Sequence, residues 1–219
     1  MRSLPLTRSL AGLPALLLPA LCALALSGCF GGISLPDEEF MVEYASPEFT
    51  GRQRLNEVLK ISKFTPAEAA LDVSMVRRTG RNKRENYPNA WWKVHPGYLV
   101  TDHLLRDLRR SELYQAVFSY RDDVDARYAL AGTVEEFIES DSDGKPQALL
   151  TVAATLLDRN AKQDPSKGVV FQKTYRIAEP LSASAPASLA SGMSRALERF
   201  SRAIQEDLYN AIRTRIKPE

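Results

Sequence analysis

The chain has 219 residues, of which 44% are hydrophobic, and its 29 Lys and Arg residues against 27 Asp and Glu give a formal net charge of +2. This balance argues against nucleic-acid binding, which normally needs a strongly basic surface, and against a polybasic patch as the means of membrane attachment. Both cysteines, Cys22 and Cys29, lie near the N-terminus. The rest of the chain therefore needs a hydrophobic core, because it has no cysteine for a disulfide or a metal site.

The first 28 residues have the features of a processing segment. Arg2 and Arg8 precede an apolar run over residues 10–26 that is short and interrupted by proline, unlike a membrane span. The run ends in Leu-Ser-Gly-Cys at residues 26–29, which resembles the lipobox of bacterial lipoproteins. We therefore predict a signal peptide over residues 1–28. An ordinary signal peptide with a chance cysteine is the alternative.

The lipobox resemblance implies that Cys29 is acylated and ties the mature chain to a membrane. Several acyl chains give stable anchoring, since each buried methylene contributes about 0.8 kcal/mol. Phe30 rather than Asp follows the cysteine, and in this resemblance that indicates the inner leaflet of the outer membrane. Residues 29–38 are predicted to be a tether, and residues 39–219 a single periplasmic domain.

Alternating hydrophobic and polar residues predict strands along the domain. Shorter strands are expected within residues 39–47, 54–64, 70–78 and 114–120, with a polar loop or edge strand at residues 79–89. Three longer segments at residues 127–138, 147–158 and 168–178 are separated by turns rich in Gly, Pro, Asp and Asn. They predict an antiparallel meander.

Two amphipathic helices are expected. The first begins at Pro96 and is predicted to bury Val100, Leu104, Leu105 and Leu108, with Asp102, Arg106, Asp107 and Arg109 facing water. The second covers residues 188–216, with an apolar stripe at Leu189, Met193, Leu197, Phe200, Ile204, Leu208, Ile212 and Ile216. The predicted class is α+β, an antiparallel sheet with a middle helix and a long C-terminal helix packed on it.

The sequence offers few residues for chemistry. His95 and His103 are the only histidines, and no spacing of further ligands joins them, so a structural role is favoured over zinc. Residues 139–144 imitate the start of a calcium loop, but Leu150 stands where the bidentate glutamate belongs, which favours a hairpin turn. No metal site, cofactor or catalytic group is predicted.

Trp91 and Trp92 are the leading candidates for a contact site, together with Tyr98 just inside the first helix. In a strand, adjacent side chains point to opposite faces. One tryptophan ring is therefore expected in the core and the other on the surface, where it could contact a partner or lipid.

Several motifs resemble one known family. Trp91 or Trp92 with Pro96 introduces the first helix, and the closing helix carries Ile204, Leu208 and Ile212. A Y-x-L-x-G-x-V-x-x-F strand is matched by Tyr128, Leu130, Gly132, Val134 and Phe137. With the lipobox, this order resembles the ABC-type transport auxiliary lipoproteins, the PqiC-like family, from about Val58 onward.

The resemblance implies a lipoprotein on the periplasmic face of the outer membrane that docks the conduit of an ABC/MCE-type lipid transport system. Its partner would be an MCE-domain protein, and it would need neither cofactor nor catalysis of its own. Direct contact with phospholipid and assembly as a homo-oligomer both stay open. The alternative functions are an outer-membrane assembly or secretion lipoprotein of the TolB or LptE type, and a periplasmic enzyme with unseen catalytic residues.

Overall fold

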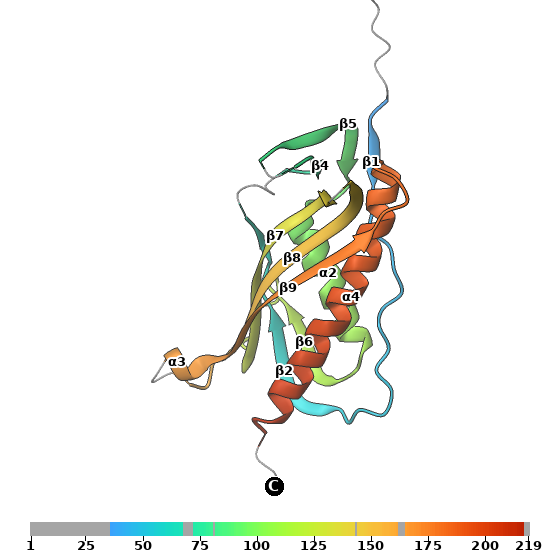
Figure 1. Cartoon of the computed structure of the whole chain (residues 1–219). Coiled ribbons are helices and arrows are strands. Elements are labelled where there is room, and N and C mark those ends of the chain that lie inside the picture. Colours follow the sequence, from blue (N-terminus) through green and yellow to red (C-terminus); the bar gives the residue numbers. More distant parts are fainter. Residues whose placement is uncertain (1–35, 68–71, 81, 143, 162–164, 217–219) are drawn as a thin grey trace, which may run out of the picture. The chain divides into compact units, whose positions relative to one another are not determined.

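The long C-terminal helix and a twisted sheet dominate the computed structural model (Figure 1), which describes residues 36–67, 72–80, 82–142, 144–161 and 165–216. The described helices and strands all belong to one compact unit that begins at Asp37. The strands are β1 (Glu38–Phe40), β2 (Leu55–Ile61), β3 (Thr65–Pro66), β4 (Ser74–Arg78), β5 (Arg84–Trp92), β6 (Tyr114–Ser119), β7 (Tyr128–Ser142), β8 (Lys145–Asp158) and β9 (Val169–Pro180). The helices are α2 (Pro96–Arg110), α3 (Pro165–Gly168) and α4 (Pro186–Arg213).

The predicted meander is confirmed, since β7, β8 and β9 pair in antiparallel order. The α+β class with a middle and a C-terminal helix is confirmed as well. The sheet, however, is mixed rather than wholly antiparallel. Strands β2, β3 and β4 all run parallel to β7, β6 runs parallel to β2, and β1 runs parallel to β5. Parallel neighbours need crossover connections, and the segment containing α2 supplies one between β2 and β6.

The segment at residues 79–89, expected as a loop or edge strand, contributes most of β5, which pairs with both β4 and β1. The strand expected within residues 39–47 is shorter, because pairing ends at Phe40 and residues 41–50 continue without strand structure. We call residues 41–50 the strap. Figure 1 shows the strap running beside α4 from β1 toward β2.

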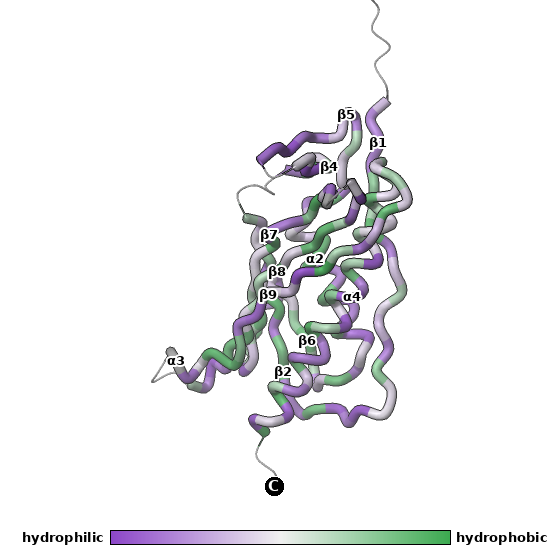
Figure 2. Tube along the Cα trace, viewed as in Figure 1, coloured by the Kyte–Doolittle hydropathy of each residue, from purple (hydrophilic) through white to green (hydrophobic). Residues whose placement is uncertain are grey.

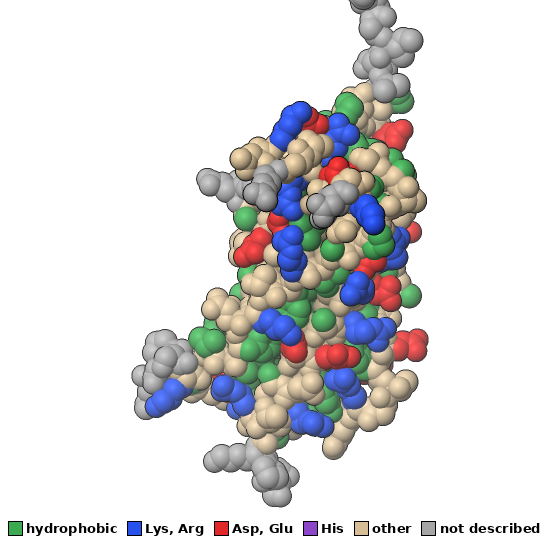
Figure 3. Space-filling view, viewed as in Figure 1, with side chains coloured by type: hydrophobic (Ala, Val, Ile, Leu, Met, Phe, Trp, Pro, Cys, Tyr) green, Lys and Arg blue, Asp and Glu red, His purple; other side chains and the backbone are tan. Residues whose placement is uncertain are grey.

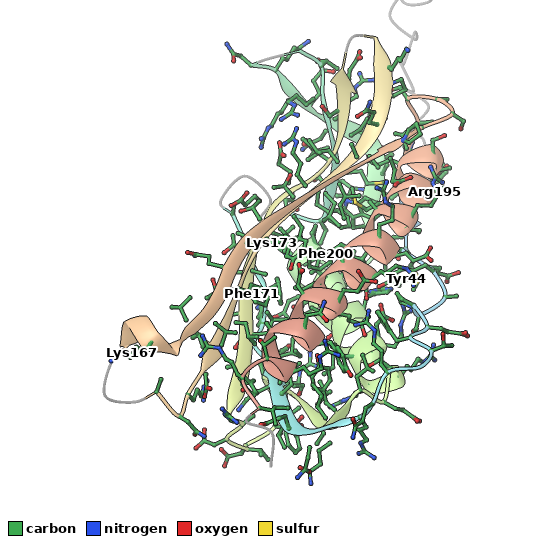
Figure 4. All side chains as sticks on the ribbon, turned by 60° about the horizontal axis from the view of Figure 1, so that its bottom comes forward. Tyr44, Lys167, Phe171, Lys173, Arg195 and Phe200 are labelled. Carbon is green, nitrogen blue, oxygen red and sulfur yellow. The ribbon has the colours of Figure 1, made fainter. Side chains whose placement is uncertain are left out.

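The two long helices, α2 and α4, pack on one face of the sheet and on each other. The predicted stripe of α4 is confirmed, since its members from Leu189 to Ile212 are buried, and Figure 2 shows hydrophobic and hydrophilic residues alternating along this helix. Figure 4 shows Phe200 pointing from α4 toward β9, where its ring meets the edge of Tyr175 with 5.4 Å between centroids. On β8, Leu150, Val152 and Leu156 belong to this core.

The stripe of α2 is also confirmed, with Val100, Leu104 and Leu108 buried and Leu105 partly buried. The helix begins at Pro96, whose fixed φ suits the first helical position. The prediction that Asp107 faces water is wrong, because its side chain is 0% exposed. At 100° per residue, position 107 lies on the same side of the helix as Val100, two turns earlier.

Gly132, in the middle of β7, lets the chain before α2 approach the sheet. A Cβ at this position would lie 2.2 Å from Cε1 of Phe64 and 2.5 Å from the carbonyl oxygen of Ala153. Phe64 is itself 0% exposed and packs where that Cβ would be. This close approach explains why glycine stands at the centre of the strand motif.

Candidate functional site

The two adjacent tryptophans lie on opposite sides of β5, as the strand pattern predicted. Trp92 is 1% exposed and packs edge-on against Phe137 with 5.0 Å between centroids. Its ring belongs to the core and is closed to a partner in this conformation. Trp91 is half-buried, and its Nε1 lies 3.5 Å from Oδ1 of Asp37. Of the two tryptophans, therefore, only Trp91 has a ring that is partly accessible to solvent.

Trp91 lies beside the point where the N-terminal segment enters the domain. It pairs with Glu39 of β1, and Lys93 forms an ion pair with the same Glu39. Met41, which follows β1, is 54% exposed. The half-buried ring of Trp91 thus lies beside the acidic side chains of Asp37 and Glu39 at the start of the described chain.

Tyr98 is half-buried near the start of α2. Its hydroxyl accepts a 2.7 Å hydrogen bond from Nζ of Lys63, which also lies 4.0 Å from the centroid of the tyrosine ring. His95 also contacts the tyrosine ring edge-on, with 6.3 Å between centroids. Tyr98 is therefore held by neighbours from two segments, and its partly open ring stays a candidate contact.

Both histidines have structural contacts. His95 is the N-cap of α2, and its Nδ1 accepts a hydrogen bond from the backbone N–H of Gly97. Nδ1 of His103 lies 2.8 Å from the carbonyl oxygen of Leu99, and its Nε2 lies 3.1 Å from the carbonyl oxygen of Val42. His103 therefore joins α2 to the strap. Within the described part of the chain, no group of three or more His, Cys, Asp and Glu side chains could hold a metal ion. Cys29, the predicted lipidation site, lies outside the described residues.

The residues resembling a calcium loop serve another purpose. Glu139 is 2% exposed and accepts hydrogen bonds from the hydroxyls of Tyr87 and Ser184, both 2.5 Å long. Burial and the hydrogen bond to Glu139 raise the pKa of Tyr87 to about 12, so the phenol stays a donor. This carboxylate of β7 is thus hydrogen-bonded both to β5 and to the loop before α4.

The strap is fastened by a buried carboxylate that the sequence analysis assigned to solvent. Asp107 accepts hydrogen bonds from Tyr44 (2.6 Å), Ser46 (2.7 Å) and Ser201 (2.6 Å). Burial, and then the nearby charge of Asp107, raise the pKa of Tyr44, which keeps the phenol protonated as a donor. Figure 4 shows Tyr44 on the strap beside the helices. The position of Asp107 on the apolar side of α2 was the signal that could have revealed this role.

A groove opens at the other end of the strap, between residues 51–57 and the last turns of α4. Its volume is about 1090 Å³, and it is lined by Arg52, Arg54, Glu57, Tyr209, Arg213 and Ile216, among others. No sequence motif pointed to it, because its arginines come from segments far apart in the chain. Elsewhere, Figure 3 shows Lys and Arg side chains interspersed with Asp and Glu over the face in view.

A comparison with models of protein families shows which family the chain belongs to. The model of the ABC-type transport auxiliary lipoprotein component family matches residues 45–205. The chain belongs to this family. The match contains the strap from Ala45 on, both long helices up to Gln205 and the whole meander, so the resemblance read from the motifs is confirmed.

Solved structures share the fold of this auxiliary lipoprotein. A Xanthomonas campestris protein assigned to the family DUF330 is 18% identical, with a TM-score of 0.73 over 81% of this chain and 97% of that one. A protein described as uncharacterized is 10% identical, with a TM-score of 0.58 over 75% of this chain and 99% of that one. A hypothetical protein of Chlamydia trachomatis is 9% identical, with a TM-score of 0.50 over 72% and 98%. No curated protein sequence matches the auxiliary lipoprotein.

A membrane span is absent from the described part of the auxiliary lipoprotein, where none of the helices is both long and apolar enough to cross a bilayer.

Proposed function

We propose that the protein is a non-enzymatic accessory of an ABC/MCE-type lipid transport system, anchored by Cys29 at the periplasmic face of the outer membrane. The match to the transport auxiliary family over residues 45–205 carries this proposal. The lipobox-like residues 26–29 support the anchor, and Phe30 supports the outer membrane as its site. In this function the domain docks the MCE-domain protein at the outer membrane.

Trp91 and Tyr98 are the proposed contact residues in this function. Both are partly open aromatic rings, and Trp91 stands beside the start of the described domain at Asp37. Asp37 follows Cys29 by eight positions in the chain, and an extended chain covers at most about 3.6 Å per position. The tether thus reaches roughly 29 Å at full extension, so Trp91 stays near the anchored membrane. Contact with phospholipid and assembly as a homo-oligomer extend the same proposal.

The test is affinity purification of the acylated protein from its own cell envelope, followed by mass spectrometry of protein and lipid. We expect an MCE-domain protein to co-purify, the chain to fractionate with the outer membrane, and Cys29→Ser to remove it from that fraction. Cys22→Ser is the matched control, since Cys22 lies inside the predicted signal peptide. Recovery of an assembly or secretion component in place of the MCE protein would contradict the proposal.

A further inference from the structure

The groove between residues 51–57 and the end of α4 has an excess of positive charge. Arg52, Arg54 and Arg213 line it, and Glu57 is the only acidic residue among its described lining residues. Glu57 is already engaged by Arg127, whose Nη1 lies 2.7 Å from its Oε1. The groove therefore has three guanidinium groups, of which Arg52 pairs with Glu206 outside the lining at 3.8 Å, and no lining carboxylate is left to balance Arg54 and Arg213.

Two of these arginines are held in place without an acidic partner. Arg54 donates from Nε to the carbonyl oxygen of Tyr114 (3.1 Å) and from Nη2 to that of Gln115 (2.9 Å). Arg213 lies over the ring of Tyr209, 5.7 Å from its centroid. Within the residues that the structure describes, neither arginine forms an ion pair with a carboxylate. Their charges are thus positioned and available.

Unsatisfied hydrogen-bond donors add a second observation. Nη1 of Arg52 and the hydroxyl of Tyr114 are both buried, and neither has a hydrogen-bond partner among the described residues. Tyr114 is 3% exposed and lines an adjoining hollow with Arg54. The other terminal nitrogen of Arg52, Nη2, forms a long ion pair with Oε1 of Glu206, 3.8 Å away. A buried donor without a partner costs about 1–3 kcal/mol, and a shift of the Arg52 side chain toward the groove that it lines would let acceptors of a ligand remove that cost.

The groove lies far from β1 along α4. The backbone N–H of Glu43, just after β1, donates to Oγ of Ser194 in the first half of α4, whereas the groove lies at Arg213. These positions are roughly 28 Å apart along the helix axis at 1.5 Å per residue. The groove therefore lies at the opposite end of α4 from the segment that follows β1.

The lining favours a peptide over a phospholipid. Leu55 and Tyr209 are buried, which leaves half-buried Ile216 and no apolar channel for acyl chains among the described lining residues. Residues 51–54 form no strand pair within the described structure, so an extended peptide could lie beside their backbone. Arginine pairs with carboxylates through two parallel hydrogen bonds.

We propose that this groove binds an acidic, extended segment of the transport partner. The inference rests on the proposed function for the existence of such a partner, and it names the docking surface and its chemistry. Arg54 and Arg213 would bind carboxylates, while Ile216 would contact an apolar side chain of the same segment.

Site-specific photo-crosslinking in the acylated full chain tests this proposal. A photo-reactive amino acid replaces Gln53, which lines the groove. In the control, the same amino acid replaces Asn86, an exposed residue of β5. We expect a crosslink from position 53 to an acidic segment of a partner protein. A crosslink from position 53 only to lipid, only to a second copy of this chain, or to no molecule would overturn the proposal.

Charge reversal distinguishes the groove from other surfaces. The double variant Arg54→Glu and Arg213→Glu is compared with Arg84→Glu and Arg121→Glu, two exposed arginines outside the groove. We expect the crosslink to fall at least tenfold in the first variant and to be unchanged in the second, with circular dichroism used to check that both variants fold. Equal crosslinking in the two variants would contradict the groove as the site.

The same material separates the two proposals. If the MCE-domain protein co-purifies equally with wild type and the groove variant, the proposed function stands and the groove proposal fails. If an acidic segment crosslinks in a charge-dependent way but belongs to another kind of protein, the chemistry assigned to the groove stands, whereas the transport partner and the proposed function fail.

Discussion

Ser201 of α4 donates a 2.6 Å hydrogen bond to Oδ2 of Asp107 in α2, so a fully buried carboxylate joins the two helices. Tyr44 donates to the same oxygen from the strap. Three segments far apart in the chain therefore meet at one side chain, which fixes the strap between β1 and the groove.

Replacing Asp107 by alanine should destabilise the domain strongly. The change leaves the hydroxyls of Tyr44, Ser46 and Ser201 without their acceptor, and removing one partner of a buried charged network costs about 3–5 kcal/mol. Chemical denaturation measures the free energy of unfolding. Asp102→Ala on the exposed side of α2 is the control and should stay within about 0.5 kcal/mol of wild type. Equal effects of the two changes would refute the role of Asp107.

Replacing each tryptophan in turn should affect a different property, stability for Trp92 and partner binding for Trp91. Trp92→Ala removes a ring that is 1% exposed and packs on Phe137, so we expect a loss of about 3–5 kcal/mol in unfolding free energy. Trp91→Ala should cost about 1 kcal/mol or less, because this ring is half-buried. Co-purification of the partner should nevertheless weaken in the Trp91 variant. A Trp91 variant with wild-type binding would remove this residue from the contact surface.

Gly132 should not tolerate even a methyl group. The Cβ of Gly132→Ala would overlap Cε1 of Phe64 at 2.2 Å and the carbonyl oxygen of Ala153 at 2.5 Å. Overpacking of this kind costs about 1–3 kcal/mol, since the backbone of β8 cannot move aside freely. Thermal unfolding of Gly132→Ala beside Ala131→Ser, at a half-buried neighbour, provides the comparison. A melting temperature unchanged by Gly132→Ala would contradict the observed packing.

Acid should destabilise the domain partly through Asp158. Burial alone would raise the pKa of this carboxyl, but hydrogen bonds from Arg127 and from the backbone N–H of Asn160 outweigh burial and lower the pKa. A carboxyl whose folded pKa is lowered contributes stability above its unfolded pKa, about 3.9, and loses that contribution as the pH falls through the folded value.

We therefore expect the free energy of unfolding, as far as Asp158 controls it, to be level above about pH 5 and to fall below about pH 4. Arg127→Gln should flatten this part of the profile, because it removes the guanidinium that lowers the pKa. Arg159→Gln, whose partner Asp125 is almost fully exposed, is the control and should leave the profile unchanged. A profile that Arg127→Gln leaves as steep as in wild type would refute the assignment.

The sequence by itself determined the local elements and the class of the protein. A period of 3.6 residues located both long helices, and alternation between turn-rich segments located the meander, because these patterns depend on neighbours in the chain. The strand motif around Gly132 and the order of elements pointed to the transport auxiliary lipoproteins, the family that matches residues 45–205. Even the burial of Asp107 was within reach, since its spacing from Val100 places it on the apolar side of α2.

Only the tertiary structure decided the strand order and the surfaces. A period of two shows which face of a strand is apolar but not which strand lies beside it, so the parallel pairing of β2 and β4 with β7 was missed. The charge of the whole chain is nearly balanced, yet the fold brings Arg52, Arg54 and Arg213 together at one groove. The charge of a local surface depends on which distant residues the fold places side by side, and the net charge of the chain does not predict that arrangement.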